Sequence, residues 1–148
     1  TAARARARAA DVLKMFRDRL LVHHHDEERD LFPAVLQVAA PGDEAERAQS
    51  MVTQLVREHS EIAQLWKQLE PDVQAIANGE LPQLNSALLH ELVKRFNEHV
   101  RTEEVEFLPF AQLVLARQAK DMAALGMALH RRHEADEIMA AAVLYGAS

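Results

Sequence analysis

The chain has 148 residues, of which 49% are hydrophobic and 27% charged, and this composition fits one globular domain over residues 1–148. A formal net charge of −6 makes nucleic acid and anionic membranes poor partners, and the absence of cysteine excludes disulfides, thiol nucleophiles and iron–sulfur clusters. We expect a cytoplasmic protein, since nothing in the cysteine-free composition points to an oxidising compartment, no apolar run approaches the length of a membrane span, and residues 1–20 carry charges where a signal peptide needs an apolar stretch.

Four long segments with helical patterns are separated by the few glycines and prolines. They cover about residues 2–39, 44–77, 82–118 and 121–145. A turn at residues 41–43 precedes the second helix, and Asp43 is its expected N-terminal cap. The same helix is expected to end at Asn78-Gly79. Pro71 predicts a bend or a split inside that helix. Long amphipathic helices joined by short turns predict an all-α fold, a four-helix up-down-up-down bundle.

Eight histidines are present, and each matters for function if it faces the core. A rotation of about 100° per residue places His24 in the middle of the apolar stripe of the first helix. Glu28 and Glu27 lie about 40° and 60° to either side of His24, so at least one carboxylate shares the buried face. His23 is marginal in this projection, and His25 points away.

The same projection places a histidine on the buried face of the next two helices. His59 lies on the stripe of the second helix, and His99 on that of the third. Glu103 is on the same side as His99, whereas Glu104 lies about 140° from His99 and should be exposed if the helix is regular. His90 is on the opposite face from His99 and belongs to the surface.

Burial of several imidazoles and carboxylates without partners would be costly, so something must compensate them. A first-row transition metal such as iron, manganese or zinc suits these donors inside a helical bundle. The Glu-x-x-His spacing of ferritin-like sites is absent. The inverse spacing, His-x-x-x-Glu, occurs at His24–Glu28 and at His99–Glu103, and it stacks ligands on successive turns of one helix face.

A proline follows each of these two pairs. Pro33 and Pro109 each remove a helix hydrogen bond and clash with the carbonyl four residues earlier. We therefore expect a bend in the helix just past each glutamate.

Residues 23–33, His-His-His-Asp-Glu-Glu-Arg-Asp-Leu-Phe-Pro, resemble the His-His-x-x-Glu-Glu-x-x-Leu-Phe-Pro signature of the hemerythrin-like (HHE cation-binding) family. Residues 99–109 are a weaker copy, and residues 57–62 are similar to the Glu-His helix of the family. The resemblance implies a non-heme di-iron site in a four-helix bundle, bridged by two carboxylates and an oxo or hydroxo group, that binds dioxygen. It implies a ligand set of His24, Glu28, His59, His99 and Glu103. Glu28 and Glu103 are then the bridges, and zinc or manganese is the alternative to iron.

Family members usually have an earlier helix that contributes a first histidine, and this chain begins near the family's second helix. Three alternatives follow. That helix lies outside this sequence, or a partner chain supplies the fourth helix of the bundle, or residues 129–134 take its place with His133 as the ligand. The rotation places His133 near the apolar stripe of the last segment and His130 closer to its edge. The same stretch also fits a short trailing helix, so these alternatives stay open.

Ala63 occupies the position where oxygen-carrying hemerythrins have a second histidine one turn after the equivalent of His59. One ligand fewer leaves an open coordination position, and favours iron binding or sensing over reversible oxygen transport.

The leading hypothesis is a metal-binding protein whose partner is a small ligand, O2, NO or peroxide. A homodimer is an option for its assembly. We expect a binding protein rather than an enzyme, because no nucleophile or substrate pocket can be identified in the sequence. One alternative is a di-iron enzyme acting on peroxide or nitric oxide. The other is a metal-free helical interaction module, which requires the buried histidines and glutamates to satisfy one another by hydrogen bonds alone.

Overall fold

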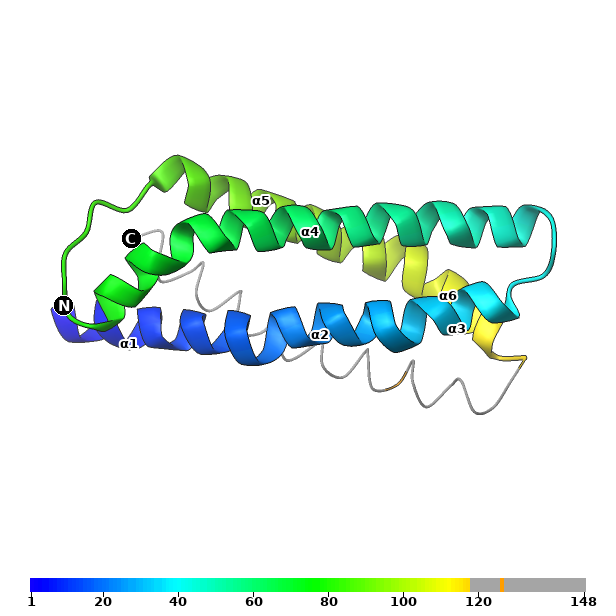
Figure 1. The fold of residues 1–148 in the computed structure, drawn as a ribbon, viewed down its shortest axis with the longest axis horizontal. Helices are drawn as coiled ribbons and strands as arrows, with labels where there is room; N and C mark the ends of the chain where they lie inside the picture. Colours follow the sequence, from blue (N-terminus) through cyan, green and yellow to red (C-terminus); the bar gives the residue numbers. More distant parts are fainter. Residues whose placement is uncertain (118–125, 127–148) are drawn as a thin grey trace.

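The computed structural model describes residues 1–117 and 126, and its helices lie in three rods (Figure 1). The first rod comprises α1 (Ala2–Lys14), η1 (Met15–Leu20), α2 (Leu21–Asp26), η2 (Glu27–Leu31) and α3 (Phe32–Val38). The second rod is α4 (Asp43–Ala77), and the third comprises α5 (Ser86–Thr102), η3 (Glu103–Phe107) and α6 (Leu108–Leu115). Elements labelled η are π-helical turns within otherwise α-helical rods. Consecutive rods run in opposite directions, so the described part of the chain goes up, down and up again.

The all-α prediction is confirmed, since the described residues contain helices and turns and no strand. The predicted fourth helix, residues 121–145, lies outside the described residues apart from Gly126. The four-helix bundle and the single domain over residues 1–148 therefore stay predictions. No helix in the described part of the chain combines the length and the apolar character that crossing a bilayer requires.

The second rod begins differently from the sequence prediction. Gly42, with a φ of 101°, precedes α4 and no side chain caps its first turn, so the expected capping role of Asp43 is wrong. Instead Glu44 Oε1 accepts a hydrogen bond of 2.9 Å from the backbone N–H of Ala40, which fixes the turn before the helix. Pro71 does not split α4, which continues to Ala77 and bends toward α1 over its last turns (Figure 1).

The third rod begins at Ser86, a few residues later than the predicted start at Pro82. Asn85 determines this start, because its side-chain oxygen accepts a hydrogen bond of 3.1 Å from the backbone N–H of Leu88. An asparagine in this position satisfies one of the N–H groups that the first turn of a helix leaves without a partner.

The first and third rods each contain a π turn that begins at a buried glutamate. In η2 the N–H of Phe32 donates to the carbonyl of Glu27, and in η3 the N–H of Leu108 donates to the carbonyl of Glu103, five residues back in both cases. A proline follows directly after Phe32 and after Leu108. A proline clashes with the carbonyl four residues earlier in a regular α-helix, and the wider turn accommodates this clash. The expected irregularity after each glutamate thus takes the form of a π turn.

Two apolar clusters form the core. One packs α1 and η1 against the C-terminal half of α4 and against α5, and it includes the rings of Phe16 and Trp66, stacked with centroids 4.0 Å apart. The other packs α3 against the N-terminal half of α4 and against η3 and α6. On each rod, residues between these clusters in the sequence are buried and polar. The core therefore has a polar middle between two apolar ends.

Candidate metal centre

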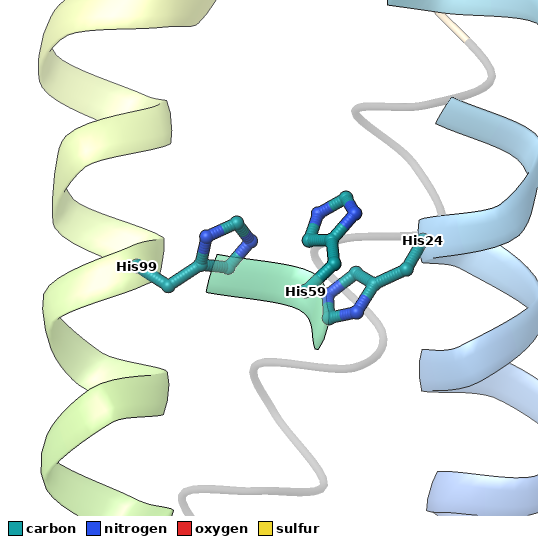
Figure 2. A group of neighbouring side chains, drawn as sticks. All are labelled: His24, His59 and His99. Carbon is teal, nitrogen blue, oxygen red and sulfur yellow. The ribbon is translucent and has the colours of Figure 1, made fainter. Parts of the chain in front are cut away.

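The polar middle contains six buried histidine and glutamate side chains, contributed by all three rods. Their exposed fractions lie between 1% and 4%, and they are His23, His24, Glu27, His59, His99 and Glu103. Figure 2 shows the imidazoles of His24, His59 and His99 projecting from three different helices toward one another. Because buried polar groups are costly unless they are compensated, this convergence indicates a site rather than ordinary core packing.

Helix geometry explains how two of the rods present their ligand pairs. Glu27 follows His23 by four residues, and Glu103 follows His99 by four, which is about one helical turn. The side chains of each pair therefore stack on one face. His23 Nε2 lies 3.2 Å from Glu27 Oε1, and His99 Nε2 lies 3.1 Å from Glu103 Oε2.

The six residues divide into two groups of three. One group consists of His24, His59 and His99, and the other of His23, Glu27 and Glu103. Within each group, one donor atom per residue lies within 4.8 Å of the others. Donor atoms that bind one ion at about 2.1 Å lie within about 4.2 Å of one another, so each group is close in size to a single coordination sphere.

The two carboxylates join these groups. Glu27 Oε1 lies 3.2 Å from His23 Nε2 in its own group and 3.5 Å from His59 Nε2 in the other. Glu103 Oε2 lies 3.1 Å from His99 Nε2, also in the other group. A carboxylate has two acceptor oxygens, so Glu27 and Glu103 both stand where a side chain can bridge two neighbouring cations.

Two further carboxylates contact the imidazoles from outside. Glu28 Oε2 lies 3.0 Å from His59 Nδ1, and Glu58 Oε1 lies 2.8 Å from His99 Nδ1. Burial raises the pKa of the Glu28 carboxyl. Burial also raises the pKa of Glu58, but hydrogen bonds from His99 and Gln54 outweigh it and leave this pKa below its usual value.

His24 provides the test of whether these residues fit a cation. Burial, together with the neighbouring imidazoles of His59 and His99, holds the pKa of His24 well below its usual value, so its ring is neutral at neutral pH. Within the described part of the chain, neither ring nitrogen of His24 has a hydrogen-bond partner, although both are buried. A neutral imidazole with an available lone pair, beside ionisable carboxylates, is the donor set that first-row transition metals bind. The residues therefore fit a metal.

The structure corrects the sequence expectation about which residues of the first rod face the centre. Glu28 is 38% exposed and contacts the outer nitrogen of His59, whereas Glu27 is 1% exposed and lies among the clustered donors. His23, which the projection left marginal, is buried as well. The His-x-x-x-Glu spacing fits His23–Glu27 as well as His24–Glu28, and the π turn η1 just before them shifts the inward face relative to a regular helix. Applying the spacing rule to every histidine would have found His23 and Glu27.

The remaining sequence expectations have mixed outcomes. Glu104 and His90 are exposed, as the projection predicts. Ala63 is half-buried on α4, one turn after the centre's histidine on that helix. His130 and His133 lie outside the described residues.

The described residues thus form a helical protein with a candidate cation site, built from buried imidazole and carboxylate donors. Residues 1–111 match the family model described as the hemerythrin HHE cation-binding domain, and the chain belongs to this family. An uncharacterized protein from Haemophilus influenzae is 23% identical over 96 residues, which are 65% of this chain and 52% of that relative. The chain thus spans about half the length of this relative. No solved structure matches the chain.

Proposed function

We propose that the chain holds two iron ions at the centre formed by its six buried donors and binds a small ligand there, dioxygen or the related NO or peroxide. The observation that carries this proposal is the division of the donors into two compact groups of three, His24–His59–His99 and His23–Glu27–Glu103. Membership of the hemerythrin HHE cation-binding family supports it.

The chain's own residues supply the charge and the shielding that such a centre needs. Glu27 and Glu103 offset the charge of the cations and lie between the two groups, which supports a bridging role for both. Phe32, buried with its ring 5.7 Å from that of His59, keeps water from this side of the centre. When bound, two iron ions supply the electrons and the open coordination positions that capture of a small oxidant requires. Ala63 carries no donor atom, which favours an open position for that ligand.

The metal-free interaction module is less consistent with the geometry. It requires hydrogen bonds alone to satisfy the buried donors. The two buried nitrogens of His24 have no such bond among the described residues. A cation explains their burial, and a hydrogen-bond network within the described part of the chain does not.

Elemental analysis of the protein isolated without added metal tests the proposal directly. We expect two iron ions per chain and, in the oxidised protein, near-ultraviolet absorption bands of an oxo or hydroxo bridge. The absorption spectrum of the reduced protein should change when it meets dioxygen or nitric oxide. Because affinity alone favours copper or zinc over ferrous iron at such donors, the metal found in the isolated protein decides its identity. A colourless protein with zinc or manganese would contradict the iron assignment, and a protein that takes up no metal would contradict the site.

Three further expectations belong to this proposal. His133 serves as an additional ligand, the protein is cytoplasmic, and a homodimer is one option for its assembly. A lower iron content in a His133→Ala variant, with an unchanged content in His130→Ala, would support the first. Sedimentation of the iron-loaded protein measures the third.

A further inference from the structure

Glu28 and Glu58 occupy equivalent places relative to the candidate centre. Each is a neighbour in sequence of one of the buried donors, Glu27 or His59, and each contacts an imidazole on the next rod. Glu28 in the first rod lies 3.0 Å from His59 Nδ1 in α4, and Glu58 in α4 lies 2.8 Å from His99 Nδ1 in α5. The first and the second rod thus each provide a carboxylate for an imidazole on the next rod.

These contacts determine which nitrogen of each imidazole faces the centre. A carboxylate in its ionised form only accepts hydrogen bonds, so opposite ionised Glu28 and Glu58 it is Nδ1 of His59 and of His99 that donates. A neutral imidazole that carries its proton on Nδ1 keeps its lone pair on Nε2. In both rings Nε2 is the inner nitrogen, 3.5 Å from Glu27 Oε1 in His59 and 3.1 Å from Glu103 Oε2 in His99.

We propose that Glu28 and Glu58 are positioning residues, which hold His59 and His99 in the tautomer and orientation that present Nε2 to the metals. This inference rests on the proposed metal site and adds a role that the ligands themselves do not have. A carboxylate behind a ligating imidazole fixes the ring and raises its basicity, and removal of such a partner typically lowers metal affinity by about 10- to 100-fold.

Glu58 is the better anchored of the two. Its second oxygen accepts a hydrogen bond of 2.9 Å from Gln54 Nε2, one turn earlier on α4. It lines a groove of about 450 Å³ together with Arg57, Glu61, Arg95, Glu98 and His99. Its side chain is 19% exposed against 38% for Glu28, so we expect its removal to have the larger effect.

Glu61 offers a matched control for Glu58. It lies one turn further along α4, in the same groove, and its carboxylate pairs with Arg95 rather than with an imidazole. The experiment compares Glu58→Ala, Glu58→Gln, Glu28→Ala and Glu61→Ala. Cobalt(II) titration of each metal-free protein measures affinity, and nitrogen-15 NMR of the imidazoles reports the tautomers of His59 and His99.

We expect Glu58→Ala to lower cobalt(II) affinity by about 10- to 100-fold and to remove the fixed Nδ1–H tautomer of His99. Glu28→Ala should do the same to His59 with a smaller loss of affinity. Glu58→Gln should lose less than Glu58→Ala, because an amide oxygen still accepts the hydrogen bond, and Glu61→Ala should behave like the wild type. A merely structural role would alter stability without this change in tautomer.

Unchanged affinity and tautomer in Glu58→Ala and Glu28→Ala would overturn the inference. Wild-type protein that binds neither cobalt(II) nor iron would overturn the proposed function, while the NMR comparison would still decide whether the carboxylates fix the tautomers. If Glu58→Ala fails to fold, as circular dichroism would show, Glu28→Ala carries the test, and a wild-type His59 tautomer together with wild-type affinity in Glu28→Ala would then count against the inference.

Discussion

The imidazole rings of His24 and His59 stack face to face, with centroids 3.7 Å apart and an angle of 6° between their planes. Both rings are buried, and each comes from a different rod. Two protonated imidazoles cannot share such a place, because their charges would repel in a region with little solvent to screen them. The stack therefore links the protonation of the centre to the stability of the bundle.

The stability of the metal-free protein should fall as the pH drops below 6.5, the ordinary pKa of histidine. The pKa of His24 is lowered in the folded protein, so between that value and 6.5 the unfolded chain binds more protons than the folded one. Stability then rises with pH in this range and is lost on acidification. Urea unfolding at pH 7.5 and at pH 5 measures the difference. A His24→Leu variant should show a flatter dependence, whereas His25→Gln, a change at the exposed neighbour, should keep the wild-type slope; equal slopes for all three would argue against this explanation.

Removal of the metal should lower the thermal unfolding temperature. A metal that binds only the folded state stabilises it by about 2.7 kcal/mol when its free concentration is 100 times its dissociation constant. A His99→Ala variant should contain less metal and lose the response to a chelator, whereas His90→Ala on the exposed face of the same helix should keep both. Calorimetry with and without chelator checks this, and an iron-loaded wild-type protein whose melting ignores the chelator would contradict it.

Replacement of Glu27 and replacement of Glu28 should have different effects on metal binding. Glu27 lies between the two donor groups, so Glu27→Ala should reduce the number of bound ions per chain. Glu28 contacts the outer nitrogen of His59, so Glu28→Ala should weaken binding without changing that number. Metal stoichiometry at saturating iron distinguishes the two carboxylates. A reduced stoichiometry in Glu28→Ala, with a normal one in Glu27→Ala, would restore the ligand set expected from the sequence.

Phe32 and Phe16 offer a matched pair of core substitutions. Both are 1% exposed, but Phe32 lies 5.7 Å from the ring of His59, whereas Phe16 stacks on Trp66 in the other apolar cluster. Replacement of a buried phenylalanine by alanine costs about 3–5 kcal/mol, so both variants should lose comparable stability in urea unfolding. Phe32→Ala should also alter the absorption spectrum of the iron-loaded protein and speed loss of metal to a chelator, because water reaches the centre. The same spectral change in Phe16→Ala would show that the effect is not local.

The sequence by itself determined the helical class of this protein and most of the inward-facing donors. Helix periodicity is a local property, and it placed His59, His99 and Glu103 on buried faces because their neighbours follow the regular rotation. The signature at residues 23–33 gave the family, since the spacing of its donors is also local. These features depend on residues within a few turns of one another.

Only the tertiary structure decided between Glu27 and Glu28, and only it paired Glu58 with His99, 41 residues apart in the chain. The choice between Glu27 and Glu28 depends on the π turn η1 in the first rod. It also depends on the neighbouring rods, which give the first rod a buried face wide enough for both His23 and His24. The second depends on how far one rod is shifted along the next. Periodicity within a helix contains no information about that shift, because packing of the apolar clusters at both ends of the bundle sets it.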